Sequence, residues 1–363
     1  MSFDAGRILE AMAALPLGRV QLMEVCGTHT MSIARSGLKS VLPENVKLLS
    51  GPGCPVCVTP AEQIDAVLEL AMEKDVILSS YGDMLRVPGS RPGDSLLRRK
   101  ALGARVEIVY SPIDAVELAR KHPDRQVVFL GVGFETTAPG TAAAVLTAQE
   151  QGVKNFSLWS MLKTVEPALR ALIAQEDFAV DGFLCPGHVA TIIGAKGFRF
   201  LPEEYGLPAV VGGFETEDIL TALYLLLKQL AEGEPKLQNA YPRAVSREGN
   251  RLAQRMLQRC FEAREDSWRG LGRIPGSGLG VIPQSGFALR EELSDYDAAK
   301  RFRICPGEAG LQNGCRCGEV ITGKLRPRQC PLFERVCTPE DPVGPCMVSS
   351  EGACAAAYKY QEI

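Results

Sequence analysis

Short apolar runs alternate with helical patterns over most of the chain before residue 238. The runs have the length and the Val, Ile and Leu content of buried strands, and they lie at 21–25, 76–79, 106–110, 127–130, 182–184 and 209–211. Segments with apolar residues at helical spacing separate them, at 61–74, 113–121, 140–151, 166–176 and 217–230. An amphipathic helix is predicted over 1–17. Because strands that alternate with helices favour parallel sheets, the predicted fold class is α/β.

A repeated local pattern suggests how this part of the chain divides. A strand, a glycine turn and threonines occur at 25–30 and again at 132–137. A chance match between two glycine turns explains this echo equally well. We predict two similar parallel-sheet α/β domains, at 18–125 and 126–240.

The pattern changes after residue 238. A charged helix is predicted at 243–264, followed by a Gly/Pro-rich loop at 274–286 and then by a tail in which cysteines dominate. We assign 241–363 to a smaller third domain, either alone or together with the helix at 1–17.

Length and charge narrow the class of protein. The chain has 363 residues, too many for one small core and suited to two or three domains. Its net charge of −3 gives no basic surface for nucleic acid. Residues 1–10 do not resemble a secretion signal, and the most apolar helical segment, 219–231, is too short for a membrane span and contains Lys228. We expect a cytoplasmic protein without a nucleic-acid or membrane partner.

The chain has 12 cysteines, which is unusual for a cytoplasmic protein. Reducing compartments disfavour structural disulfides, so clustered cysteines indicate metal or redox roles. The densest cluster lies between Cys305 and Cys354, whereas Cys185 and Cys260 are isolated and fit core positions.

Cys26 lies where a predicted strand ends and a helix begins. Open parallel sheets bind ligands at this edge, and backbone N–H groups at a helix start favour a thiolate. His29, three residues further on, is a candidate second ligand or proton carrier. The alternative is a buried cysteine beside a helix-capping threonine.

Cys54 and Cys57 form a Cys-x-x-Cys motif in a Gly/Pro-rich loop. Thr59 and Glu62 then predict a capping box at the start of the next helix. Thiols just before a helix N-terminus have lowered pKa values, which suits metal binding or reversible disulfide formation. A structural zinc site is the alternative, but it needs two further ligands and Cys26 supplies one of them. We therefore predict an open metal site of three thiols, Cys26, Cys54 and Cys57.

Two further turns carry residues suited to chemistry. Glu135 follows the strand at 127–130, and His188 follows the strand at 182–184. Glu215 lies in a third turn of the same kind. We predict Glu135 and His188 as catalytic residues together with His29 and the three thiols, and helix capping is the alternative for the two glutamates. The remaining histidine, His122, precedes Pro123 in a polar stretch and is predicted to lie on the surface.

The cysteine-rich tail contains no Cys-x-x-Cys knuckle of the kind that zinc ribbons use. Its cysteines are irregularly spaced, and iron–sulfur clusters accept four thiolates from such spacing. The tail is therefore predicted to be an iron–sulfur domain, with zinc as the alternative. More thiols are present than four ligands require, and the others are candidate redox partners.

Taken together, these motifs resemble the HypD family of hydrogenase maturation factors. The resemblance is carried by residues 23–30, 51–57, 133–137, 186–189, 268–272, 317–320, 330–333 and 349–354. It implies a scaffold with redox ability, rather than a classical enzyme, on which the Fe(CN)2CO group of [NiFe] hydrogenases is assembled. The partners that it implies are a HypC-type small chaperone and a HypE-type protein that delivers cyanide.

The resemblance also implies roles for single residues. Cys26 matches the essential iron-site cysteine, and Cys54 and Cys57 match a redox or iron-associated pair. A [4Fe–4S] cluster is implied on Cys317, Cys330, Cys337 and Cys354. Cys315 and Cys346 lie outside the family's cluster pattern, which leaves their roles open. Alternatives from other classes are a [4Fe–4S]-dependent disulfide reductase and a zinc-stabilised interaction module.

Overall fold

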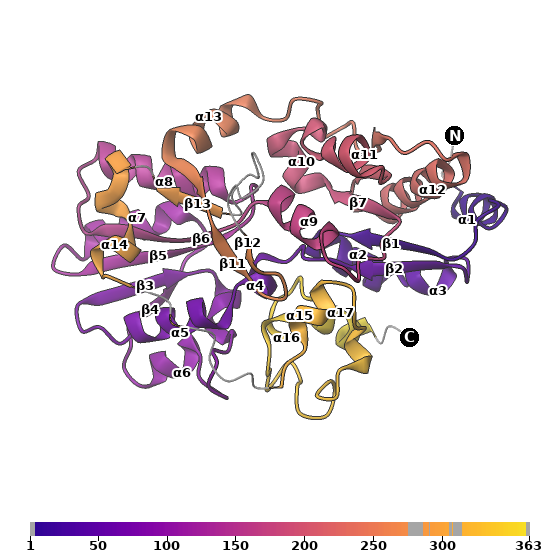
Figure 1. The fold of residues 1–363 in the computed structure, drawn as a ribbon. Helices are drawn as coiled ribbons and strands as arrows, with labels where there is room; N and C mark the ends of the chain where they lie inside the picture. The colour runs from indigo at the N-terminus through magenta and orange to yellow at the C-terminus, as the bar shows by residue number, and fades with distance from the viewer. Residues whose placement is uncertain (1–3, 275–285, 290, 305–306, 308–313, 361–363) are drawn as a thin grey trace.

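The computed structural model describes residues 4–274, 286–289, 291–304, 307 and 314–360. Two parallel sheets lie side by side, and the C-terminal helices pack between them (Figure 1). The prediction of an α/β fold with parallel sheets is confirmed.

The first sheet is built from two distant parts of the chain. Its strands, in spatial order, are β2 (Val46–Ser50), β1 (Val20–Glu24), β7 (Gly182–Pro186), β8 (Ala209–Gly212) and β9 (Leu237–Asn239). One of its faces is covered by α1 (Ala5–Ala13), α2 (Gly27–Ser36), α3 (Leu38–Val41) and α12 (Thr216–Glu232). Leu22, Ile33 and Leu223 form part of the apolar core between these helices and the sheet. The helices α9 (Val165–Ile173), α10 (Gly187–Ile193) and α11 (Phe200–Tyr205), with the short η2 (Ala195–Phe198), belong to a second core.

The second sheet comes from the intervening part of the chain. Its strands, in spatial order, are β4 (Val106–Ile108), β3 (Val76–Ser80), β5 (Gln126–Gly133) and β6 (Phe156–Leu162). One core contains α7 (Pro112–Lys121), α8 (Ala138–Glu150) and α13 (Arg251–Cys260). The core that holds α9, α10 and α11 also contains α4 (Pro55–Val58), α5 (Ala61–Leu70), η1 (Gly82–Arg86) and α6 (Leu96–Ala101). This second core continues without a break into the C-terminal helices, so the cysteine-rich tail shares a core with both sheets.

The remaining elements are short. β10 (Phe261–Arg264) pairs antiparallel with β13 (Gly286–Leu289), and β11 (Asp266–Trp268) forms a hairpin with β12 (Gly272–Ile274). They are followed by η3 (Glu291–Tyr296), α14 (Ala298–Arg301), α15 (Cys317–Ile321), η4 (Pro327–Gln329), α16 (Pro345–Val348) and α17 (Ala353–Tyr360). α15 and α16 pack on α4, and α17 packs on α2.

The two sheets do not follow the predicted boundary at residue 125. β1 and β2 lie before it and pair with strands that lie after it, while β3 and β4 share a sheet with β5 and β6. The chain therefore crosses between the sheets twice. A boundary drawn from local sequence patterns misses this, because strand pairing depends on contacts between segments far apart in the chain.

Several local predictions differ from the structure. The apolar runs predict neither β2 nor β6 nor β9. The charged helix begins only at Arg251, because Asn250 caps it there with bonds from the N–H groups of Leu252 and Ala253, and its predicted last turn is strand β10. The predicted capping box is wrong, because Pro60 is the N-cap of α5 and the Thr59 hydroxyl bonds back to Pro55 O at 2.9 Å. Residues 275–285 and Cys305 lie outside the described residues.

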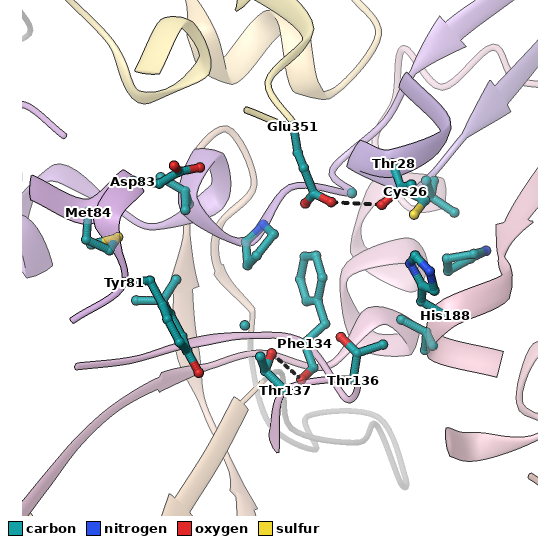
Figure 2. Close-up of a pocket in the computed structure, with 18 residues that line it drawn as sticks. Cys26, Thr28, Tyr81, Asp83, Met84, Phe134, Thr136, Thr137, His188 and Glu351 are labelled. Atoms are coloured by element: carbon teal, nitrogen blue, oxygen red, sulfur yellow. Dashed lines mark hydrogen bonds between the residues drawn. The ribbon is translucent and has the colours of Figure 1, made fainter. Parts of the chain in front are cut away.

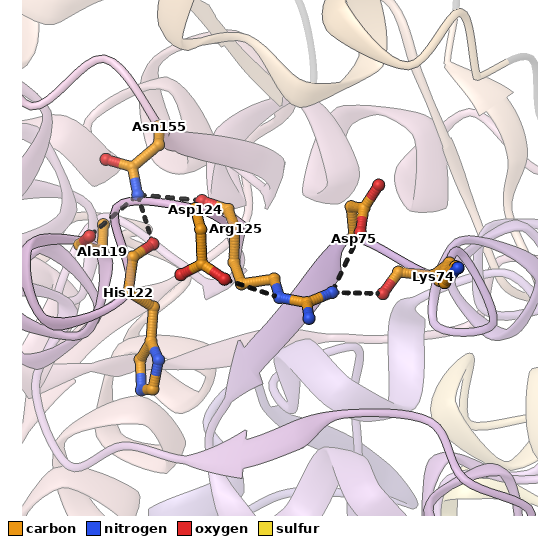
Figure 3. Close-up of polar contacts among 7 residues, drawn as sticks. All are labelled: Lys74, Asp75, Ala119, His122, Asp124, Arg125 and Asn155. Atoms are coloured by element: carbon orange, nitrogen blue, oxygen red, sulfur yellow. Dashed lines mark hydrogen bonds and ion pairs between the residues drawn. The ribbon is translucent and has the colours of Figure 1, made fainter.

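Polar contacts hold the chain where it enters β5 (Figure 3). The Asn155 side-chain amide donates to the carbonyls of Ala119, His122 and Arg125 at 2.8 to 3.0 Å. The Arg125 guanidinium pairs with Asp75 at 2.9 Å. The side chain of His122 is exposed, as its sequence context predicts. Within the described ranges, no helix has both the length and the apolar character needed to cross a membrane.

Candidate functional site

A cavity of about 350 Å³ lies between the two sheets (Figure 2). It is lined by residues that follow β1, β3, β5 and β7, by the loop before α4, and by Glu351 from the C-terminal segment. β1 and β7 belong to one sheet, and β3 and β5 to the other. The carboxyl ends of strands from both sheets therefore meet at one site, which is where parallel sheets bind ligands.

Cys26 lies in this cavity as the N-cap residue of α2, with an extended backbone at φ −153°. The location at a strand end and a helix start agrees with the sequence prediction. The expected thiolate does not, because burial raises the pKa of the Cys26 thiol to about 12. Backbone N–H groups of His29 and Thr28 act in the opposite direction, but burial outweighs them.

Cys54 and Cys57 are joined by a disulfide, and Cys54 directly follows Gly53 in the loop that contacts Cys26. Cys54 is the N-cap of α4, and its Sγ accepts the Cys57 N–H at 3.1 Å. The preceding Gly53 allows the close approach, since a Cβ there would collide with the backbone of Cys26. Gly27 N also donates to Gly53 O at 2.9 Å. Gly53, the residue before Cys54, therefore packs directly on the Cys26 backbone.

A site of three thiols holding one metal is not formed in this state. The sulfurs of Cys54 and Cys57 bond to each other. Among the described residues, no group of three or more Cys, His, Asp or Glu side chains is arranged to hold a metal ion. Joint binding by Cys26, Cys54 and Cys57 stays a prediction that requires the disulfide to open.

The two histidines predicted at the site are separated by Phe214. His29 is fully buried outside the cavity lining, and its Nε2 donates to Gly213 O at 2.8 Å. Burial lowers its pKa to about 4, so this ring is neutral. His188, in the first turn of α10, lines the cavity and stacks on Phe214 at 3.9 Å between ring centroids. Burial also lowers the pKa of His188.

The two glutamates lie at helix starts instead of in the cavity lining. Glu135 Oε1 accepts the N–H of Val165, the first residue of α9, at 2.9 Å, and burial raises the Glu135 pKa to about 7. Glu215 is the N-cap residue of α12. For both residues the position favours the capping interpretation over a direct role in the cavity.

Glu351 is a cavity residue that the sequence patterns do not assign. Its Oε1 accepts the Thr28 hydroxyl at 2.8 Å, as Figure 2 shows, and a Cβ on Gly27 would collide with its side chain. The two preceding serines make further contacts. Ser349 Oγ lies 3.3 Å from Cys54 Sγ, and Ser350 Oγ donates to Asp83 at 3.0 Å. The sequence signal for this segment is its place in the motif at 349–354, which carries the family resemblance but assigns no role to Glu351.

A second, much smaller cavity of about 20 Å³ lies in the cysteine-rich tail. The cysteines that line it are Cys315, Cys317, Cys330, Cys337, Cys346 and Cys354. The four predicted cluster ligands are among them, and so are the two that lie outside the family's pattern. Hydrogen bonds with Cys317 and Cys354 lower the pKa of the Cys346 thiol. Thiols are the donor type that iron–sulfur clusters and zinc both take, and in this state no three of these described side chains are arranged to hold a metal ion.

Comparison with known proteins identifies the family. The sequence model of HypD, described as "Hydrogenase formation hypA family", matches residues 5–361. The chain belongs to this family. The hydrogenase expression/formation protein HupD of Azotobacter chroococcum mcd 1 is 44% identical over 357 residues, which cover 96% of this chain and 92% of the relative. The hydrogenase maturation factor HypD of Escherichia coli K12 is 45% identical over 344 residues, which cover 94% and 90%.

These matches confirm the resemblance to HypD that the motifs indicate. They make the chain a hydrogenase maturation factor. The match to a solved structure of 2,3-dimethylmalate lyase covers 67% of this chain and 82% of the lyase chain. Its sequence identity of 12% and TM-score of 0.16 are too low to support a conclusion about this chain.

Proposed function

We propose that this HypD-family chain is the scaffold on which an Fe(CN)2CO group is assembled with a HypC-type chaperone and a HypE-type cyanide donor. The observation that carries the proposal is the position of Cys26. Cys26 lines the cavity between the two sheets, and the Cys54–Cys57 disulfide follows Gly53, which packs on the Cys26 backbone. The cavity belongs to a hydrogenase maturation factor, and iron is the cargo that such a factor handles.

Cys26 is the proposed ligand of the cargo iron. A soft thiolate suits iron that carries cyanide and carbon monoxide. Burial holds the thiol protonated, but a bound cation favours the thiolate, so iron and the proton compete for the same sulfur. The cavity of about 350 Å³ is large enough for small diatomic ligands beside this sulfur. His188 is the residue that we propose to orient them, because His29 and Glu135 lie outside the lining.

The disulfide gives the site its proposed redox ability. A dithiol reductant opens it by thiol–disulfide exchange, in which the Cys54–Cys57 bond breaks, two thiols form and the reductant becomes a disulfide. The freed thiols would lie beside Cys26 as further ligands for the cargo.

The tail would hold the resident cofactor. The thiolates of Cys317, Cys330, Cys337 and Cys354 would bind a [4Fe–4S] cluster. When bound, such a cluster supplies one-electron redox chemistry. The segment 349–351 connects this part of the chain to the disulfide and to the cavity. The same adjacency favours a second candidate, a disulfide reductase fed by the cluster.

Infrared spectroscopy of the anaerobic protein, purified with its small chaperone, tests the scaffold. Cyanide and carbon monoxide bands are expected in the wild type and in C185A, which loses a buried cysteine in β7, but not in C26A. H188A is expected to keep the bands at shifted frequencies, because a hydrogen bond to the ligands is lost. Bands and hydrogenase maturation that persist in C26A would contradict the scaffold. A brown chain with acid-labile sulfide but no bands would favour the reductase, and a colourless chain containing zinc would favour the interaction module.

A further inference from the structure

The motif at 268–272 carries the family resemblance, yet no part of the proposed function uses it. It lies in the β11–β12 hairpin, which contacts Phe134 in the lining of the cavity between the sheets and Gly318 next to Cys317 of the smaller cavity. The hairpin contacts the wall of the larger cavity, the disulfide helix α4 and the cysteine-bearing helix α15. Each contact involves a different residue of the motif.

The hairpin is fixed to the second sheet by a buried ion pair. Lys163 Nζ lies 2.6 Å from Asp266 Oδ2, and Gln63 donates to the other carboxylate oxygen at 2.8 Å. Trp268, next to this pair, is 1% exposed and stacks on Phe134 with ring centroids 5.9 Å apart. Phe134 lines the larger cavity. The start of the hairpin is therefore held rigidly against the cavity wall.

The turn of the hairpin is fixed to the tail. Gly270 has a φ of 80°, and a Cβ at this position would collide with the backbone of Gly318. Gly318 follows Cys317, one of the cysteines of the smaller cavity. A glycine is required here for both reasons, and the backbone on each side of Arg269 is thereby anchored.

Arg269 faces the end of the disulfide helix between these two anchors. Its backbone N–H donates to Val58 O at 2.8 Å, and its guanidinium donates to Thr59 O at 2.9 and 3.2 Å. Val58 is the last residue of α4 and Thr59 is its C-cap, and both are fully buried. Carbonyl groups at a helix end lack partners within the helix and favour cations. Because α4 is a single turn of four residues, it has few bonds of its own to keep it folded.

We propose that Arg269 is the positioning residue of the Cys54–Cys57 pair. It holds α4 in the conformation that places the two sulfurs together, in the reduced state as well as in the oxidised one. The effective concentration of one thiol at the other is then high, which favours the disulfide. This inference rests on the redox role proposed for the pair, but it concerns a property of the isolated chain.

The thiol–disulfide equilibrium with glutathione measures this property. Reduction breaks the Cys54–Cys57 bond and forms two thiols, while two glutathione thiols are oxidised to one glutathione disulfide, so electrons and protons balance. The full-length chain is equilibrated without oxygen at pH 7 over a series of glutathione ratios. Differential alkylation and mass spectrometry of the peptide that contains both cysteines then give the equilibrium constant for this pair alone.

Three variants decide the question. R269A is expected to lower the equilibrium constant for disulfide formation by up to about tenfold, because without the charge-assisted hydrogen bonds the reduced α4 can leave the conformation that the disulfide still imposes on the oxidised one. R269K keeps one donor group, so its equilibrium constant is expected to lie between those of R269A and the wild type. R273A is the matched control, because Arg273 lies in the same hairpin with a side chain that is 80% exposed and paired to Glu265 at the surface.

An unchanged constant in R269A, or an equal loss in R273A, would overturn the proposal. Circular dichroism shows whether each variant is folded. If R269A is unfolded, R269K decides: a lowered constant supports the positioning role and an unchanged one overturns it. The measurement needs neither iron nor a hydrogenase, so its outcome is independent of whether Cys26 carries the cargo.

Discussion

Glu135 links the stability of the protein to pH in a direction opposite to that of most carboxylates. The residue is 4% exposed, and Oε1 is paired with Val165 N, but Oε2 has no hydrogen-bond partner among the described residues. Burial raises its pKa from 4.5 to about 7, and the Val165 bond only partly opposes this. The folded protein therefore binds this proton more tightly than the unfolded chain does.

The direction of this pH dependence follows from the number of protons that Glu135 binds in the folded and in the unfolded state. Below pH 4.5 both states carry the proton, and the stabilisation is fully present. As the pH rises from 4.5 to about 7, only the folded state keeps the proton, so the free energy of unfolding falls. At about 1.4 kcal/mol for each unit of pKa difference, the total loss above the folded-state pKa is about 3 kcal/mol. Between pH 5 and 7.5 the loss is about 2 kcal/mol.

E135Q removes this titration, and its amide oxygen can still accept the Val165 N–H. Urea unfolding followed by the fluorescence of the buried Trp159 and Trp268 gives the free energy of unfolding at each pH. The free energy of E135Q minus that of the wild type is expected to rise by about 2 kcal/mol from pH 5 to 7.5. Taking the difference removes the contribution of Glu24, whose pKa burial also raises, to about 8.

The control is E117Q, since the Glu117 side chain is 47% exposed on the surface of α7. The free energy of unfolding of E117Q minus that of the wild type is expected to stay nearly constant from pH 5 to 7.5. A constant difference for E135Q, or a rise as large in E117Q, would refute the account of Glu135 as a buried carboxyl that is neutral below pH 7.

Two further predictions concern close contacts. K163A leaves Asp266 buried without its cation and is expected to lower the free energy of unfolding by about 3–5 kcal/mol in urea titrations. K163M restores the lost volume and is expected to lower the free energy of unfolding by no more than K163A does. Equal stability of K163A and the wild type would contradict this prediction. G27A places a Cβ against Glu351 and is expected to increase amide hydrogen exchange in the adjoining C-terminal segment. G18A, where the added Cβ meets no atom within 4 Å, is the control, and equal exchange in both variants would argue against the contact.

Local sequence patterns predict a strand when its residues form an unbroken apolar run, and uniform burial alone does not make a strand predictable. Val76–Ser80 is buried at every position, and its apolar run marks it as a strand. β6 is buried at every position as well, but Ser157 and Ser160 interrupt its apolar run, so the same reasoning misses it. The polar groups of this strand are hidden by packing that the local sequence does not reveal.

The candidate site shows the same limit. Cys26 is predictable because a strand end and a helix start are neighbours in sequence. Glu351 is not, because its partner Thr28 lies 323 residues away. His29 is predictable as part of the motif but not in its orientation, since contact with Gly213 and Phe214 turns its ring away from the cavity. Chemistry that depends on one turn of the chain is thus visible in the sequence, and chemistry that depends on the meeting of distant segments is not.

The double crossing of the chain between the sheets also sets the order in which the protein can be completed on the ribosome. β1 ends at Glu24, but β7, its neighbour on one side, begins only at Gly182. At the usual pace of synthesis, roughly 10–30 s pass before that neighbour is translated. During this interval Cys26 lacks β7 and the residues at its end, which form one wall of the cavity in the complete chain. The lining of this cavity also includes Glu351, so a growing chain completes it only when nearly all of the polypeptide has been made.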